Sequence, residues 1–199
     1  MKIEIKTTRV ILSVLFMMVV LVMQAFPVDI EVGISLGSYG KNDELFKELY
    51  GAKSTVPGFG AVFFFTRHVG FFFDVGAVSH EGLSTYDSTP LTYKETHFAL
   101  GVQYRLRLHS FSADKRVDFY LKGGSLFLKY SETYREKGGA TVPGLYLGGG
   151  VLFRWQKFGV GIEMAKNYSY EEIEIQGLNI VESIDFSGFR LSLKGTYTF

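Results

Sequence analysis

Seven charged residues occupy the polar positions of segments in which apolar and polar residues alternate. They are the acids Glu31, Asp74 and Glu163 and the bases Arg105, Arg154, Arg190 and Lys194. Side chains two residues apart in a strand point to the same face, so the charges are expected on one side of a sheet. If that side is enclosed, the charges must pair. The favoured interpretation is a salt-bridged structural network, and the functional alternative is a narrow conductance gated by rearranging pairs.

The chain has four histidines, which are candidates for acid–base catalysis. His68 and His109 fall at predicted turns, His80 falls in a predicted long loop, and His97 falls on a polar strand face. Acyl or peptide transfer needs a histidine within hydrogen-bond reach of a nucleophile or an orienting acid. His97 has Ser79 and Glu95 as candidate partners, but no catalytic motif surrounds them. Satisfied or exposed histidines and a non-enzymatic protein are the prediction.

Composition excludes several other classes of site. The chain has no cysteine, which excludes disulfides, thiolate metal sites and a cysteine nucleophile. Its 21 basic and 20 acidic residues give a net charge of +1, so no basic field for nucleic acid is present. No zinc spacing or phosphate loop occurs, so neither metal nor cofactor is expected.

The elements that position these residues are predicted to be strands. The chain has 23 glycines, 19 phenylalanines and 12 tyrosines, a composition that favours β structure. Apolar residues alternate best at the end of the chain, from Phe189 to Phe199. Eight such segments are predicted: Asp29–Tyr39, Val56–Thr66, Val69–Ser79, Lys94–Leu108, Val117–Tyr130, Gly144–Arg154, Phe158–Tyr168 and Ile184–Phe199. Most match or exceed the ~9–11 residues with which a tilted strand crosses a bilayer.

The predicted connections alternate between short and long. The short ones lie near Arg67-His68, Ser110–Arg116 and Trp155–Lys157. The long, polar ones are Gly40–Thr55, His80–Tyr93, Ser131–Pro143 and Ser169–Ser183. Basic residues in or near them, which an extracellular partner or lipid phosphates could contact, are Lys41, Lys47, Lys53, Lys94, Arg135 and Lys137. Acidic residues are interspersed, so a solvated mixed-charge surface is the favoured interpretation.

Two details of the strands bear on the interior. Phe64 and Phe72 are expected to point inward, either to fill a small barrel or to line an apolar compartment for a small hydrophobic molecule. In Val117–Tyr130 the apolar residues change parity, with Phe119 and Leu121 on one face and Leu126 and Leu128 on the other. A bulge near Gly123 and Gly124 is the predicted cause.

The N-terminal segment is typical of a secretory signal. Lys2, Lys6 and Arg9 precede an apolar run that ends at Met23, and Gln24-Ala25 follows. Cleavage is predicted after Ala25, which divides the chain into a signal peptide (1–25) and one β-barrel domain (26–199). The apolar run is shorter than the ~20 residues of a spanning helix.

With this leader, these eight segments and the ending Phe189–Phe199, the chain resembles the small eight-stranded outer-membrane proteins of the OmpA-transmembrane-domain, OmpX and OmpW type, a porin-like group. The resemblance implies an all-β fold, an eight-stranded antiparallel transmembrane β-barrel behind a cleavable signal peptide, in the cell outer membrane. It also implies that Leu193, Tyr197 and Phe199 form an assembly signal read by the barrel assembly machinery.

The predicted function is a structural, adhesive or small-solute role in the cell envelope, with outer-membrane lipids as partners. A narrow channel or binding protein for small hydrophobic molecules is one alternative, and a lipid- or peptide-processing enzyme is another. A soluble lipocalin-like barrel would instead turn its apolar residues inward.

Overall fold

The computed structural model describes residues 29–51, 53–83, 90–132, 138–175 and 180–199. The predicted signal peptide lies outside these residues. The strands are β1 (Asp29–Lys41), β2 (Ser54–Phe64), β3 (Val69–Leu83), β4 (Pro90–Ser110), β5 (Lys115–Glu132), β6 (Gly138–Trp155), β7 (Phe158–Ile175), β8 (Ile180–Asp185) and β9 (Gly188–Thr198), with one short helix, α2 (Glu44–Tyr50). Among the described residues, no helix is long and apolar enough to cross a membrane.

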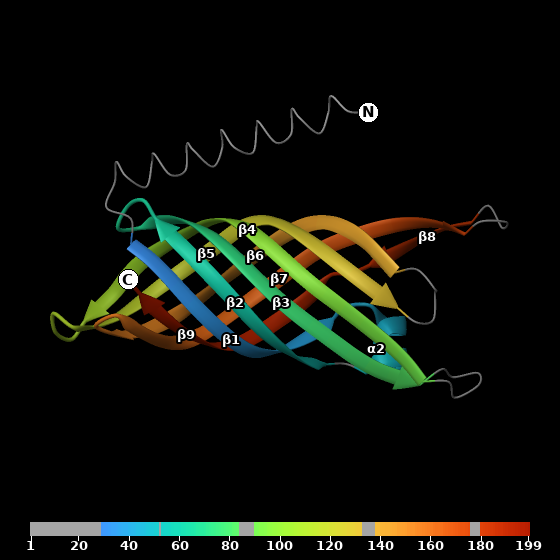
Figure 1. Ribbon diagram of the computed structural model, residues 1–199, viewed down its shortest axis with the longest axis horizontal. Helices are drawn as coiled ribbons and strands as arrows, with labels where there is room; N and C mark the ends of the chain where they lie inside the picture. The colour runs from blue at the N-terminus through green and yellow to red at the C-terminus, as the bar shows by residue number, and fades with distance from the viewer. Residues whose placement is uncertain (1–28, 52, 84–89, 133–137, 176–179) are drawn as a thin grey trace, which may run out of the picture.

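Neighbouring strands pair antiparallel and the sheet closes on itself (Figure 1). The chain meanders from β1 to β7, and β9 then pairs with both β7 and β1. Closure brings Leu36 opposite Leu193 and Val32 opposite Tyr197. Because every strand of the closed part has two neighbours, no open edge remains there. The predicted all-β, eight-stranded antiparallel barrel is confirmed.

The last predicted segment, Ile184–Phe199, is not one continuous strand. It is interrupted at Phe186 and Ser187. Before the interruption β8 pairs with β7, and after it β9 pairs with β7 and closes the barrel. The Ser169 amide donates to the Ser187 hydroxyl, and the Phe186 amide donates to the Ser169 carbonyl. The interruption turns the Phe186 ring into the interior, where it is buried.

The predicted bulge near Gly123 and Gly124 is wrong. The β4–β5 register runs through both glycines without a shift, and its irregularity falls between Arg107 and His109. Gly124 lies opposite Gly101, and a Cβ on either would press on the backbone of the other strand. Glycine permits this close approach of two strands.

The barrel has two different ends (Figure 1). At the turn end, β2 and β3, β4 and β5, and β6 and β7 are joined by the short connections 65–68, 111–114 and 156–157, as predicted. At the loop end, the predicted loop Gly40–Thr55 contains α2, whereas the described parts of the other three predicted loops are strand: β3 continues to Leu83, β4 begins at Pro90 and β7 reaches Ile175. These polar stretches keep an alternating pattern, and so the backbone ladder continues through them.

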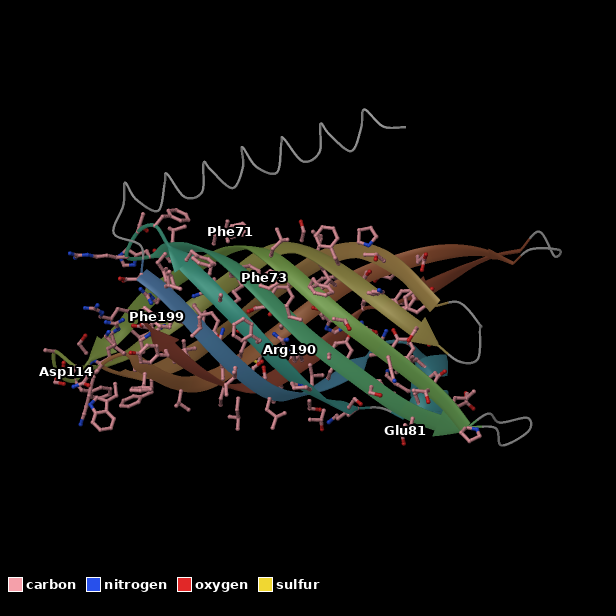
Figure 2. All side chains as sticks on the ribbon, viewed as in Figure 1. Phe71, Phe73, Glu81, Asp114, Arg190 and Phe199 are labelled. Atoms are coloured by element: carbon pink, nitrogen blue, oxygen red, sulfur yellow. The ribbon has the colours of Figure 1, made fainter. Side chains whose placement is uncertain are left out.

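An apolar band surrounds the outside of the barrel. It includes Ile34, Leu36, Phe59, Phe71, Phe73, Phe98, Val102, Leu121, Leu147, Val151, Val160, Ile162, Leu191 and Leu193, all exposed. Figure 2 shows Phe71 and Phe73 on this outer surface. Toward the loop end the outward residues become polar, as at Ser79, Glu81, Lys94 and Lys129. The apolar side chains thus cover the outside of the barrel, whereas a lipocalin-like barrel would carry them on its inner face.

Candidate functional site in the barrel interior

The centre of the barrel holds a compact charge cluster around Glu163. Its carboxylate oxygens lie 3.0 Å from Lys122 Nζ, 2.7 Å from Arg190 Nη2 and 3.2 Å from Lys194 Nζ. Asp74 Oδ2 lies 2.6 Å from the same Lys122 ammonium. All five side chains are buried, between 2% and 7% exposed, and Figure 2 shows Arg190 in the middle part of the barrel. Three cations therefore share two carboxylates.

Two tyrosines complete the hydrogen bonding of this central cluster. The Tyr120 hydroxyl donates to Glu163 at 2.9 Å, and the Tyr146 hydroxyl donates to it at 3.2 Å. Arg190 donates to the Tyr146 oxygen at 2.9 Å. A buried ionic group is tolerated when its hydrogen bonds are made in this way.

A second charge layer lies nearer the turn end. Glu31 pairs with Arg154 and lies 3.6 Å from Arg105 Nη1. Asp118 pairs with Arg154 at 2.6 Å and with Arg116 at 3.1 Å. The seven charged residues expected on the polar face are thus all buried inside, in two separate layers.

Apolar side chains pack beside these layers. The buried group comprises Val62, Phe64, Phe72, Ala99, Leu126, Tyr146 and Ala165. The Arg105 guanidinium carbon lies 3.9 Å from the centroid of the Phe64 ring, and Lys122 Nζ lies 5.2 Å from that of Phe72. The two phenylalanines therefore point inward, as expected, where they cover cationic groups.

A third charged group lies toward the loop end, between the outward polar residues Lys94 and Thr96 and so beyond the apolar band. Here Glu95 pairs with Lys41 and His97 and accepts hydrogen bonds from the hydroxyls of Tyr93 and Tyr39. Burial opposes the charged carboxylate, but Lys41 and His97 outweigh that and hold the pKa of Glu95 well below its usual range.

Replacing Glu95 with Gln tests this assignment through pH. A depressed folded-state pKa contributes stability that is complete above the unfolded-state value of about 4.3 and is lost as the pH falls toward the folded-state value. The variant should therefore be less stable than the native protein at about pH 7, and the difference should shrink at about pH 3. Urea unfolding at both pH values measures it, with Glu81→Gln at the exposed end of β3 as control. A difference that is constant or larger in acid would contradict the assignment.

An aromatic cap closes the interior at the loop end. Buried Tyr50, Leu91, Tyr93, Leu128, Tyr130, Val142 and Phe186 form it, with Phe46 of α2 packed against them. The Phe46 ring lies 4.8 Å from that of Tyr93 and 4.9 Å from that of His80. Burial and the nearby Lys41 lower the pKa of His80, so this ring is neutral among the aromatics at neutral pH.

Only one of the two candidate partners of His97 is beside it. His97 contacts Glu95, but Ser79 is exposed on the outer face of β3 while His97 points inward. His68 lies at a turn with its Nδ1 2.9 Å from the Arg105 carbonyl, and exposed His109 packs on Phe111. Among the described residues, no group of three His, Cys, Asp or Glu side chains is placed to hold a metal.

Comparison with known proteins gives likeness in structure only. No family model and no curated protein sequence matches the chain. OprG of Pseudomonas aeruginosa superposes with a TM-score of 0.58 at 10% identity, over 86% of this chain and 95% of OprG. Neisserial surface protein A, NspA, superposes with a TM-score of 0.52 at 15% identity, over 86% of this chain and 97% of NspA. The fold is that of the small eight-stranded outer-membrane β-barrels.

The last strand of this outer-membrane barrel fold presents its apolar residues outward. Leu193 and Phe199 are exposed, and the Tyr197 ring packs edge-on against Phe158 and Phe199, with centroids 5.1 and 5.0 Å away. The Phe199 amide donates to the Ile30 carbonyl at 2.9 Å. Figure 2 shows Phe199 at the turn end.

Several buried interior residues were not predicted from the sequence. Lys122 and Asp118 lie on β5, where the apolar residues change parity and a predicted bulge near Gly123 and Gly124 left the inward face undefined. A continuous parity through Gly123 and Gly124 would have placed both inside, with Leu126 and Leu128. Lys41 was expected in an outer loop but is buried, because β1 continues two residues beyond Tyr39. Lys47, Lys53 and Lys94 are exposed as expected, and Arg135 and Lys137 lie outside the described residues.

Proposed function

We propose that the protein is a non-enzymatic, sealed β-barrel of the outer membrane that serves a structural role and displays a polar sheet outside the cell. The main support for this proposal is that buried side chains fill the interior of the barrel. A water-filled channel would leave its lining exposed, whereas the central cluster is between 2% and 7% exposed and Phe72 is fully buried. The aromatic cap adds a second closure above it.

The outer surface supports the membrane assignment. An exposed apolar band on a closed barrel matches the lipid-facing surface of outer-membrane barrels, which have short periplasmic turns and longer outer connections. By this rule the turn end lies in the periplasm and the loop end outside. Outer-membrane lipids are then the partners of the band, and mixed charges at the loop end would meet an extracellular partner in an adhesive role.

The alternatives have weaker support. A channel for hydrophobic molecules would need an apolar passage, but Phe64 and Phe72 are packed in the buried apolar group. An enzyme would need a nucleophile beside His97, and Ser79 lies on the other side of the wall. These placements favour the structural role.

Conductance distinguishes a sealed barrel from a channel. The purified mature barrel, inserted in planar bilayers, should give no discrete current steps, because the central cluster leaves no water path. Insertion is verified in parallel by protease protection in liposomes. Stable unitary steps from the folded protein would contradict the proposal.

Deleting Phe199 tests the assembly role inferred for Leu193, Tyr197 and Phe199. The ring is exposed at the turn end of the barrel, so its loss should cost less than the ~1.5–3 kcal/mol of a fully buried aromatic and leave refolding in detergent largely intact. If the barrel assembly machinery reads this end, the yield in cells should fall much more than the refolding yield. Normal yields in both settings would remove the assembly role.

A further inference from the structure

A cavity of about 390 Å³ opens at the turn end of the lumen, separate from the central cluster. Four arginines line it: Arg67, Arg105, Arg107 and Arg116. His68 and two acids, Asp29 and Asp118, complete the lining. Its size is within the ~300–1,000 Å³ usual for small-molecule pockets.

The lining holds four arginines but only two acids. Asp118 is committed to Arg154 at 2.6 Å and Arg116 at 3.1 Å. Exposed Arg67 and Arg107 make no ion pair with another described residue. At least two guanidinium groups at this opening therefore lack a carboxylate partner in the described part of the chain.

Arg105 forms the inner wall of the cavity and is held in place. It is 7% exposed, its guanidinium carbon lies 3.9 Å from the Phe64 centroid, and its Nη1 makes no hydrogen bond in the described structure. Nη1 forms a long ion pair with Glu31 Oε2, at 3.6 Å. A buried donor without an acceptor is costly and rare.

The turn between β2 and β3 fixes the geometry. The Arg105 amide donates to the His68 carbonyl at 2.6 Å, and Arg105 Nη2 donates to the Arg67 carbonyl at 3.4 Å. His68 Nδ1 lies 2.9 Å from the Arg105 carbonyl. Arg67 is thereby held next to Arg105, on a rigid connection between two strands.

We propose that this cavity binds a small, soluble, phosphate-bearing anion. Planar guanidinium groups form paired hydrogen bonds to phosphate oxygens, and Arg105 Nη1 offers a desolvated donor for one of them. The four arginines line the cavity, whereas Leu106 and Leu108, next to Arg105 and Arg107 on β4, are exposed on the outer face. A dissolved anion entering from the periplasm fits this orientation better than the phosphate of a lipid head group.

Calorimetric titration of the refolded mature barrel with pyrophosphate tests the proposal. Saturable binding is expected, and the double variant R67Q/R107Q should weaken it by at least about tenfold, the loss of one charge-assisted hydrogen bond or more. Both residues are exposed and unpaired, so the variant should fold normally. The control K115Q/K157Q removes two exposed charges at the same end outside the cavity and should change binding less than about twofold.

Three results would overturn the proposal. The first is the absence of saturable binding. The second is equal weakening in both double variants, which would show only diffuse attraction to a basic end. A lipid source is tested by repeating the titration in phosphatidylcholine and phosphatidylglycerol nanodiscs, where affinities within about threefold are expected. Loss of pyrophosphate binding in phosphatidylglycerol alone would assign the cavity to a lipid head group instead.

Discussion

Replacing Glu163 with Gln is expected to destabilise the barrel by about 3 kcal/mol or more. The carboxylate faces Lys122, Arg190 and Lys194 at 2.7–3.2 Å, and all are buried. Removing one partner of a buried ionic group leaves an uncompensated charge, which costs roughly 3–5 kcal/mol. Glutamine keeps the size and some hydrogen bonding, so the loss reports on charge. Urea unfolding in lipid vesicles, followed by gel mobility, measures it.

Two further variants sharpen this result. Glu81→Gln, at the exposed loop end of β3 (Figure 2), should change stability by less than about 0.5 kcal/mol. E163Q/K194M, which removes one of the stranded cations, should recover part of the loss. If E163Q were as stable as E81Q, the central cluster would not hold the barrel together.

Replacing Ile162 with Arg is expected to cost about 2–4 kcal/mol, the penalty for a basic residue at the middle of the lipid-facing surface. Ile162 is exposed and lies opposite both Val151 and Leu193, midway along the apolar band. In a soluble barrel an exposed Ile→Arg change would be nearly neutral. The size of the loss in unfolding free energy therefore shows whether lipid or water surrounds the band.

Ser79→Arg is the matched control, because Ser79 points outward beyond the band. It should cost only about 0–1 kcal/mol, as near a membrane interface. Equal and small effects of both substitutions, measured in the same vesicles, would show that the band does not contact the hydrocarbon core.

The strands whose alternation is clean were predictable from the sequence. Phe189 to Phe199 and Phe158 to Met164 placed Arg190, Lys194 and Glu163 on one face, and all three lie in the central cluster. Alternation alone could not place Leu126 and Leu128 in the interior, because an apolar side chain can pack inside the barrel or face lipid. Lys122 has the same parity on β5, and so its inward orientation could not be predicted either.

Tertiary contacts determine the rest of the interior. The break at Phe186 and Ser187 depends on hydrogen bonds from Asn42 and Ser169, which are far away in the chain. The burial of Lys41 depends on Glu95, which lies on another strand. The basic cavity depends on a turn that sets Arg67 beside Arg105. These contacts join residues that are far apart in the sequence, so local sequence patterns could not predict them.

Membrane fractionation tests the central claim most directly. The full 199-residue chain, expressed in a Gram-negative host, should sediment with the outer membrane on a density gradient. It should also run faster on a gel before boiling than after, because a closed barrel resists detergent until it is heated. Recovery in the soluble periplasmic fraction, with one mobility before and after boiling, would contradict the claim that this chain is an outer-membrane β-barrel.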